Sequence, residues 1–297
     1  MAALVTMLWV TANRIAAADL IAHDVAVPRP VSDGVIVGRA ECGGTVWLLN
    51  EDHQLAGVVT NTRHIAIRQV HGLKADDRPW GLACVQGELW TLADPRVLAR
   101  IGADGRVEER VTFPVPRIAL FGAGDRLLYE QIPPVAGAAL FSSSPPRKPR
   151  DVRRWPGLLA RPAVEPGRLL TDNLVSCGLT HEGAIPCWFP DETNVTISNG
   201  SRVERRAFPF LRGPGAATAV PIHDVAVRDR GRVWLMATAR ERIRGRLVGG
   251  SLALASLDGR EIGRLSLNRP ARMILAATDT TCLLLTASGG LLEINER

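Results

Sequence analysis

Two pairs of polar residues stand where an otherwise apolar sequence could do chemistry. Asp172-Asn173 and His223-Asp224 each mark the beginning of a run of alternating apolar residues, "NLVSCGL" and "HDVAVRD". Carboxylate and amide oxygens are the ligands that a hard cation such as Ca²⁺ prefers, and Asp or His can also act as a general acid or base. Polar residues at strand starts also commonly satisfy backbone groups at loop ends. The residues alone leave both interpretations open.

Two arginines begin further apolar runs and change the expected ligand. Arg117 and Arg272 would repel a cation bound beside them, whereas guanidinium groups pair well with carboxylate or phosphate. We therefore predict no metal site, and expect these residues to bind an anionic or polar ligand. The predicted ligand-binding residues are Arg117, Asp172, Asn173, His223, Asp224 and Arg272.

The sequence lacks the short motifs that mark common enzyme classes. It has no G-x-S-x-G elbow, no P-loop, no G-x-G-x-x-G after a strand and no H-E-x-x-H. The 6 histidines are dispersed, and the 5 cysteines show no C-x-x-C spacing. We therefore expect no cofactor and no structural zinc.

The composition favours a well-packed chain with an arginine-based positive charge. The 297 residues are 46% hydrophobic, enough for one large all-β domain or two ordinary ones. The net charge of +6 comes almost entirely from arginine, since lysine occurs only at Lys74 and Lys148. This charge is mild, and few aromatic residues are available to stack on bases, so we expect no nucleic-acid partner.

The N-terminus resembles a secretory signal. Residues 2–10 are apolar and are followed by Ala16-Ala17-Ala18, a small-residue cleavage pattern. No other segment reaches the ~18 apolar residues of a membrane helix. We predict a signal peptide over residues 1–18, one domain over 19–297, a periplasmic or secreted location and no membrane insertion after processing. The alternatives are a mis-set start codon or an unprocessed tail.

Two cysteines are spaced for a cross-strand bridge. Cys177 and Cys187 flank the turn His181-Glu182-Gly183, close to where facing positions of a hairpin would lie. If the protein is exported, a disulfide between them is expected. The other cysteines, Cys42, Cys84 and Cys282, are interpreted as buried apolar residues.

The chain repeats one strand pattern along its length. Residues 80–113 and 223–267 both contain a strand, a short turn, a second strand with Trp90 or Trp234, a third strand, an Asp-Gly-Arg turn and a fourth strand. Asp-Gly is a strong hairpin signal because tight primed turns need a positive φ. Similar runs begin near residues 35, 118, 173 and 272, so the spacing is 38 to 55 residues. Such spacing is typical of propeller blades.

The last repeat has only three strands before the chain stops. A lone alternating strand within residues 20–30 precedes the first complete repeat. We predict that it adds to the last repeat as its outer strand, which would leave no unpaired edge at the seam.

The repeat pattern resembles the six-bladed β-propellers of the broad group that includes NHL-repeat proteins, TolB-like domains and gluconolactonase-type enzymes. The expected fold is therefore an all-β, six-bladed β-propeller whose N-terminal strand completes the last blade; a pair of β-sandwiches or a seven-bladed ring are the alternatives. The resemblance implies that the first residues of each innermost strand surround the mouth of a central channel. Gluconolactonase-like propellers also hold a metal there, but they place a Glu in the first blade, where this chain has the apolar stretch 34–38.

Two functional hypotheses follow. The first is an exported propeller that serves as a binding platform for an unknown protein or an anionic small molecule, through an arginine-lined channel face. The alternative is a metal-dependent hydrolase or lactonase with its site at the channel mouth. The segment 238–250, with four arginines, is expected to open on the same face.

Overall fold

The computed structural model consists of β-strands and the short 3₁₀ turn η2 (Pro209–Leu211) in the part of the chain that it describes. The described residues are 18–26, 31, 34–74, 77–131, 141–143, 153–155, 176–179, 183–189, 193–199, 201–211, 220–228, 231–243 and 246–297. No helix among them is long and apolar enough to cross a membrane. The predicted all-β class is confirmed.

Four consecutive groups of four strands form separate antiparallel sheets. Unit 1 contains β2 (Ile36–Cys42), β3 (Thr45–Asn50), β4 (Gln54–Val59) and β5 (His64–Gln69). Unit 2 contains β6 (Leu82–Val85), β7 (Glu88–Asp94), β8 (Val97–Ile101) and β9 (Val107–Thr112). Unit 3 contains β10 (Arg117–Ala123), β11 (Arg126–Gln131), β12 (Phe141–Ser143) and β13 (Arg153–Arg154). Unit 4 contains β14 (Ser176–Cys177), β15 (Ile185–Trp188), β16 (Asn194–Ser198) and β17 (Val203–Ala207).

The remaining strands form one seven-stranded sheet, ordered β1-β23-β22-β21-β20-β19-β18. Its members are β1 (Leu20–Val25), β18 (Ile222–Val227), β19 (Arg232–Ile243), β20 (Arg246–Ser256), β21 (Glu261–Ala277), β22 (Thr281–Thr286) and β23 (Leu291–Glu296). The long strand β21 serves two groups: its first half pairs with β20, as at Ser266↔Ser251, and its second half pairs with β22, as at Met273↔Leu285. Unit 5 is therefore β18, β19, β20 and the first half of β21, and unit 6 is the second half of β21 with β22, β23 and β1.

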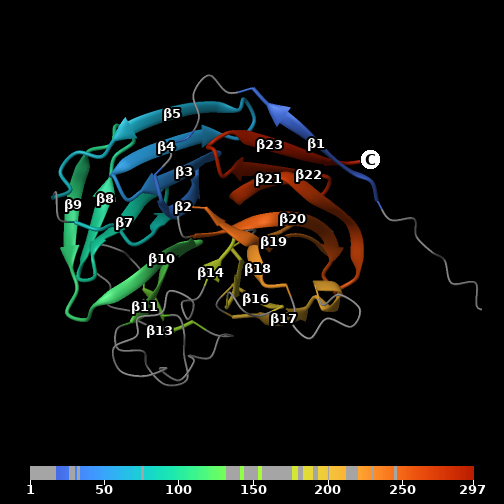
Figure 1. Cartoon of the computed structure of the whole chain (residues 1–297). Coiled ribbons are helices and arrows are strands. Elements are labelled where there is room, and N and C mark those ends of the chain that lie inside the picture. Colours follow the sequence, from blue (N-terminus) through green and yellow to red (C-terminus); the bar gives the residue numbers. More distant parts are fainter. Residues whose placement is uncertain are drawn as a thin grey trace, which may run out of the picture.

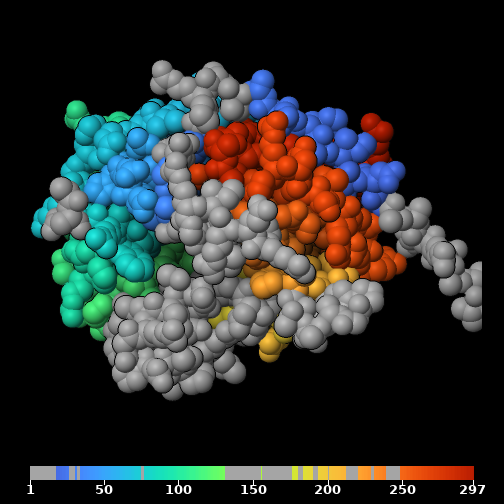
Figure 2. Space-filling view, in the orientation of Figure 1, coloured from blue at the N-terminus to red at the C-terminus, as the bar shows by residue number. Residues whose placement is uncertain are grey.

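The N-terminal strand completes unit 6, as predicted from the sequence. β1 pairs antiparallel with β23, from Leu20↔Glu296 to Val25↔Leu291. Figure 1 shows β1 beside β23 next to the C-terminus. In the space-filling view of Figure 2, the blue N-terminal segment lies against the red C-terminal part. The two ends of the described chain are thus held in one sheet.

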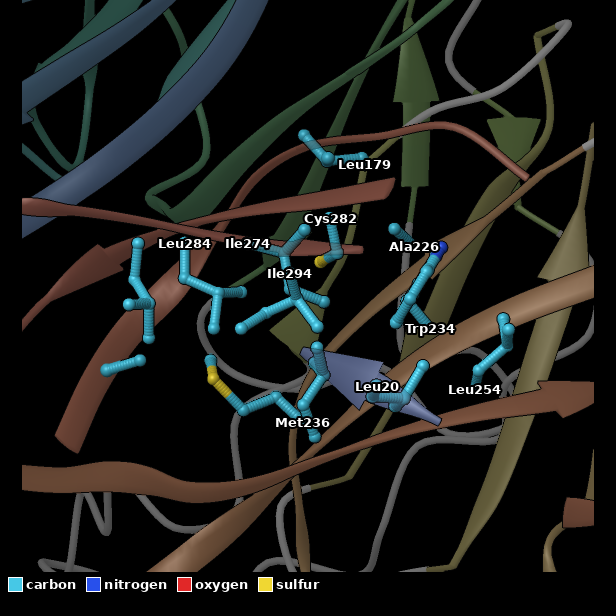
Figure 3. Close-up of a cluster of buried hydrophobic side chains, with 13 residues drawn as sticks. Leu20, Leu179, Ala226, Trp234, Met236, Leu254, Ile274, Cys282, Leu284 and Ile294 are labelled. Atoms are coloured by element: carbon cyan, nitrogen blue, oxygen red, sulfur yellow. The ribbon is translucent and has the colours of Figure 1, made fainter. Parts of the chain in front are cut away.

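Hydrophobic clusters join each unit to the next. Figure 1 shows the units arranged around a common centre. The cluster between units 5 and 6 includes Trp234, Leu254, Ile274 and Leu284, which come from four different strands (Figure 3). A further cluster packs the apolar side chains of unit 6 against those of unit 1. Because burial of apolar surface is the main favourable term in folding, these clusters hold the units together as a ring.

Glycine allows the first strands to approach one another closely near the centre. A Cβ atom at Gly38 of β2 would collide with the backbone of Leu82 in β6, and one at Gly178 would collide with the carbonyl oxygen of Val225 in β18. Leu179, which follows Gly178, forms a parallel bridge with Ala226. The first strands of these neighbouring units therefore lie side by side.

Two disulfides join strands near the centre. Cys177 and Cys187 are bonded across β14 and β15, the pair expected from the sequence. Cys42 and Cys84 form a second disulfide between β2 and β6, so their interpretation as buried apolar residues was wrong. They meet because the first strands of units 1 and 2 are neighbours, which a separation of 42 residues along the chain conceals. Cys282 is buried and free, and burial raises the pKa of its thiol.

The arginine-rich segment 238–250 extends the hairpin of β19 and β20. Its outer pairs include Arg242↔Leu247 and Ile243↔Arg246. Because Ile222 at the start of β18 pairs with Ala237, this hairpin projects from the face where the first strands begin. The Pro- and Arg-rich segment 142–168 lies mostly outside the described residues.

Replacing a tryptophan of a second strand tests how much the packing between units contributes to the stability of the fold. Trp47, Trp90 and Trp234 each pair with an alanine of the preceding first strand. Trp234 is fully buried and donates a hydrogen bond from Nε1 to the Thr278 carbonyl oxygen at 2.8 Å. We expect Trp234→Ala to lower the free energy of unfolding by about 3–5 kcal/mol, because it leaves a cavity between units 5 and 6.

Urea-induced unfolding would measure this loss. Trp47→Ala is the matched control, since Trp47 holds the equivalent position but is only half-buried, and its loss should be smaller. Equal losses in both variants, or near-wild-type stability of Trp234→Ala, would contradict the packing described above.

Candidate functional site

An extra residue interrupts the start of the first strand in five units. In the pairing of first and second strands, the register skips Val37 in β2, Ala119 in β10, His223 in β18 and Arg272 in β21. Gly81 is skipped in the same way in unit 2, because Trp80 bonds to Leu92 while Leu82 pairs with Thr91. The corresponding stretch of unit 4 lies outside the described residues. A β-bulge re-aims a side chain, and here the bulges recur at one level of the ring.

All of these bulged residues line one central cavity of about 1590 Å³. Its wall is formed mainly by the first strands and by the loops that lead into them. Partly buried apolar side chains, Trp80, Phe121 and Met273, alternate there with polar ones. The repeat thus places equivalent positions from different units around one space.

A buried ion pair joins two strands of the cavity wall. The Arg39 guanidinium of β2 contacts the Asp224 carboxylate of β18 with both terminal nitrogens, Nη1 to Oδ2 at 2.5 Å and Nη2 to Oδ1 at 3.0 Å. Their side chains are only 10% and 5% exposed. Such a bidentate pair is among the strongest that proteins form.

The same ion pair also binds backbone groups of other units. Arg39 donates to the carbonyl oxygens of Ile274 in β21 and Cys177 in β14. Asp224 accepts from the backbone N–H of Ile274 at 2.7 Å and of Val225 at 2.9 Å. One buried pair therefore connects units 1, 4, 5 and 6.

His223 lies beside this pair and is held through one ring nitrogen. Its Nε2 donates to the Arg272 carbonyl oxygen at 2.8 Å, which requires the proton on Nε2 and leaves Nδ1 as an acceptor. Burial is the main cause that lowers the pKa of His223, and the charge of Arg39 lowers it further; the Arg272 carbonyl and Asp224 act in the opposite direction. The imidazole is therefore neutral at pH 7.

The Arg272 side chain links unit 6 to the loop that leads into the first strand of unit 1. Its guanidinium donates to the Ala287 carbonyl oxygen at 2.8 and 3.1 Å and to the Gly34 carbonyl oxygen at 2.8 Å. Its side chain is thus held against backbone carbonyl oxygens at the cavity wall.

The structure brings together three of the six residues predicted to bind ligand. His223, Asp224 and Arg272 all line the cavity. Asp172 and Asn173 lie outside the described residues, so their placement stays a prediction.

Arg117 lies away from the other predicted site residues. It is buried between units 2 and 3, with its guanidinium carbon 3.4 Å from the ring centre of Phe113 and 3.9 Å from that of Tyr129. Burial lowers the pKa of Arg117 to about 10, so the guanidinium remains charged at neutral pH. The position equivalent to His223 in unit 3 is Ala119, two residues further along β10.

Arg39 is the central residue that sequence reasoning missed. The available signal was a single charged side chain two positions after Val37 within the apolar stretch that opens unit 1. Alternate residues of a strand share a face, so Val37, Arg39 and Glu41 follow one another along the cavity wall.

No three His, Cys, Asp or Glu side chains of the described residues lie together as metal ligands would. Asp224 accepts four hydrogen bonds, which occupy the lone pairs of its two carboxylate oxygens. Its role is therefore to hold Arg39 and two backbone N–H groups.

Antiparallel units packed face to face around a central cavity define a β-propeller. Similar architectures occur in BF0058 of Bacteroides fragilis (TM-score 0.58, 7% identity, covering 97% of this chain and 97% of that one), and in virginiamycin B lyase of Staphylococcus aureus (0.53, 9%, 93% and 99%). The Cps50 (Swd1) β-propeller domain of Myceliophteria thermophila is also similar (0.52, 10%, 91% and 98%). No protein-family model matches the sequence, and no curated protein matches it. At such low identity these likenesses concern the fold.

Replacement of Arg39 tests the central ion pair. We expect Arg39→Met to lower the free energy of unfolding by about 3–5 kcal/mol, because it leaves the Asp224 carboxylate buried without its partner. The control is Arg269→Met, which breaks the exposed pair of Arg269 with Asp24 and should cost about 0–1 kcal/mol. Chemical denaturation measures both values, and similar losses would refute a special role for Arg39.

Acidification tests the environment of His223. The pKa of His223 is lower in the folded than in the unfolded state, so the unfolded chain binds the proton first as the pH falls. The stabilising contribution of His223 is therefore complete above its unfolded pKa of about 6.5 and is lost as the pH falls below that value. Between pH 8 and pH 5, the melting temperature of His223→Gln should fall less than that of the wild type. Glutamine keeps a donor for the Arg272 carbonyl oxygen but does not titrate. An identical pH profile for both proteins would contradict the buried neutral imidazole.

Proposed function

We propose that this protein is an exported, six-bladed β-propeller that binds a partner protein over its central cavity. The six-fold count is supported by six groups of four strands, counting β21 twice, and by the clusters that join successive groups. The binding role is supported above all by one observation: bulges on five first strands aim equivalent positions at one open cavity.

The face where the first strands begin offers groups that suit a protein partner. Glu51, Asp52 and Arg78 are exposed at the cavity, next to the partly buried Trp80. Interfaces typically combine an aromatic or apolar centre with a polar rim. The mixed signs of charge at this rim favour a partner with a patterned polar surface.

Export is supported by chemistry as well as by the N-terminal sequence. Disulfides persist mainly in oxidising compartments, and two join strands in this fold. The proposed signal, residues 1–18, falls almost wholly outside the described residues. A periplasmic or secreted location is therefore our proposal.

A more specific version of this proposal is that the cavity binds an anionic small molecule. Three arginines line the cavity, but Arg39 is neutralised by Asp224 and the donors of Arg272 bind carbonyl oxygens. The positive charge that the described wall offers to a ligand is therefore smaller than the sequence suggested, and the exposed Arg78 would supply it. The metal-dependent hydrolase has less support, because the Asp224 oxygens are already fully used.

Site-specific photo-crosslinking in living cells tests the proposed binding face. A photoreactive amino acid in place of Arg78, at the cavity rim, should give one discrete protein adduct. The same amino acid in place of Thr112, exposed on the outer strand β9 of the same unit, should give none. Adducts from both positions, or from neither, would contradict a binding face at the cavity.

Cell fractionation with N-terminal sequencing tests export in the same cells. We expect the mature chain outside the cytoplasm, beginning after the alanine triplet. Retention in the cytoplasm with an intact N-terminus would overturn export.

A further inference from the structure

A serine from the neighbouring unit faces the cavity at the level of His223. Leu179 and Ala226 form a parallel bridge, with the Leu179 N–H donating to the Val225 carbonyl oxygen at 3.2 Å. Ser176, the first residue of β14, pairs with Trp188, whose Nε1 donates to the Ile222 carbonyl oxygen at 3.1 Å, so Ser176 lies near the start of β18, where the His223 bulge is. Both residues line the cavity and both are half-buried.

These two side chains present unused hydrogen-bonding atoms. Nε2 of His223 is bound to the Arg272 carbonyl oxygen, and within the described part of the chain Nδ1 has no protein partner. The Ser176 hydroxyl likewise has none among the residues described. By contrast, the neighbouring Arg39–Asp224 pair is fully engaged. Ser176 and His223 are thus the groups at this level that a ligand can use.

The two groups have complementary chemistry. A neutral imidazole with its proton on Nε2 offers a lone pair at Nδ1 and accepts a hydrogen bond, whereas a serine hydroxyl can donate one. A ligand group that carries a donor beside an acceptor matches both, with the donor at Nδ1 and the acceptor at the hydroxyl. A primary amide has an N–H on the same side as its C=O, whereas a carboxylate has only acceptors and would face the Nδ1 lone pair.

We propose that Ser176 and His223 form a subsite for a neutral primary amide, such as the side-chain amide of an Asn or Gln in a bound peptide segment. The amide N–H donates to Nδ1 of His223, and the amide carbonyl oxygen accepts from the Ser176 hydroxyl. The charged groups around His223 are Asp224, Arg39 and Arg272, and the first two neutralise each other. This inference rests on the proposed function, since it names the chemistry by which the same cavity recognises its partner.

Two probes of equal size separate an amide from an anion. The full-length protein, labelled with ¹⁵N-histidine, is titrated with acetamide and separately with sodium acetate at constant ionic strength. The His223 ring nitrogens are followed by long-range ¹H–¹⁵N spectra, with the His223→Gln variant supplying the assignment. Acetamide should shift the Nδ1 resonance saturably in the millimolar range, and acetate should not.

Two serine variants provide the matched comparison. Ser176→Ala should weaken acetamide binding about threefold to tenfold, as expected for one neutral hydrogen bond. Ser201→Ala removes a hydroxyl from the exposed Asn199 turn and should leave binding unchanged. Equal effects of both variants would overturn the role of Ser176.

The possible failures are distinguishable. A shift of Nδ1 with acetate alone would overturn the amide subsite and support the anion-binding form of the proposed function. No shift with either probe up to near-molar concentration would overturn the subsite by itself. The crosslinking result at Arg78 would then decide separately whether the cavity face binds a partner.

Discussion

The buried ion pair between Arg39 and Asp224 is the interaction on which the centre of this ring depends. Removing two charges from water is costly, and only excellent geometry with further hydrogen bonds offsets that cost. Both conditions are met here, because the pair is bidentate and every carboxylate lone pair is used. The pair also reaches Cys177 and Ile274. First strands from four units therefore share one electrostatic centre, and the open part of the cavity lies around it.

The bulges explain how a repeated architecture acquires a site. Each unit is built from the same alternation of apolar residues, which buries side chains between neighbouring sheets. In the five units whose strand starts are described, one extra residue in the first strand breaks that alternation and brings the bulged position to the cavity. Where the bulged residue is Val37 or Ala119 the wall is apolar, and where it is His223 or Arg272 the wall is polar. Differences between repeats at one position thus give the cavity its chemical asymmetry.

Much of the fold could be predicted because it depends on local patterns. Alternating apolar runs located the strands, and the Asp-Gly turns were correct, since Gly105 and Gly259 have φ values of 88° and 87°. The missing strand of the last repeat pointed to β1, and its pairing with β23 confirms that closure. These features need no knowledge of how the units meet in space.

The site was harder to predict because it depends on contacts across the ring. Arg39 and Asp224 are 185 residues apart, and Cys42 meets Cys84 only through the packing of neighbouring units. A bulge adds one residue without changing composition, so the sequence did not show that the bulge of β10 lies at Ala119, two residues after Arg117, which was assigned to the cavity. His223 and Arg272 line the cavity because the apolar run begins at the bulge itself, and their role in ligand binding stays a prediction.

A double-mutant cycle on Arg39→Met and Asp224→Asn tests whether this buried ion pair acts as a unit in stabilising the ring. The free energies of unfolding of the wild type, both single variants and the double variant give the coupling between the two side chains. We expect a coupling energy of about 2 kcal/mol or more, since each residue loses its main partner when the other is replaced. If the two effects add within about 0.5 kcal/mol, Arg39 and Asp224 do not act as a unit, and the ring does not depend on their ion pair.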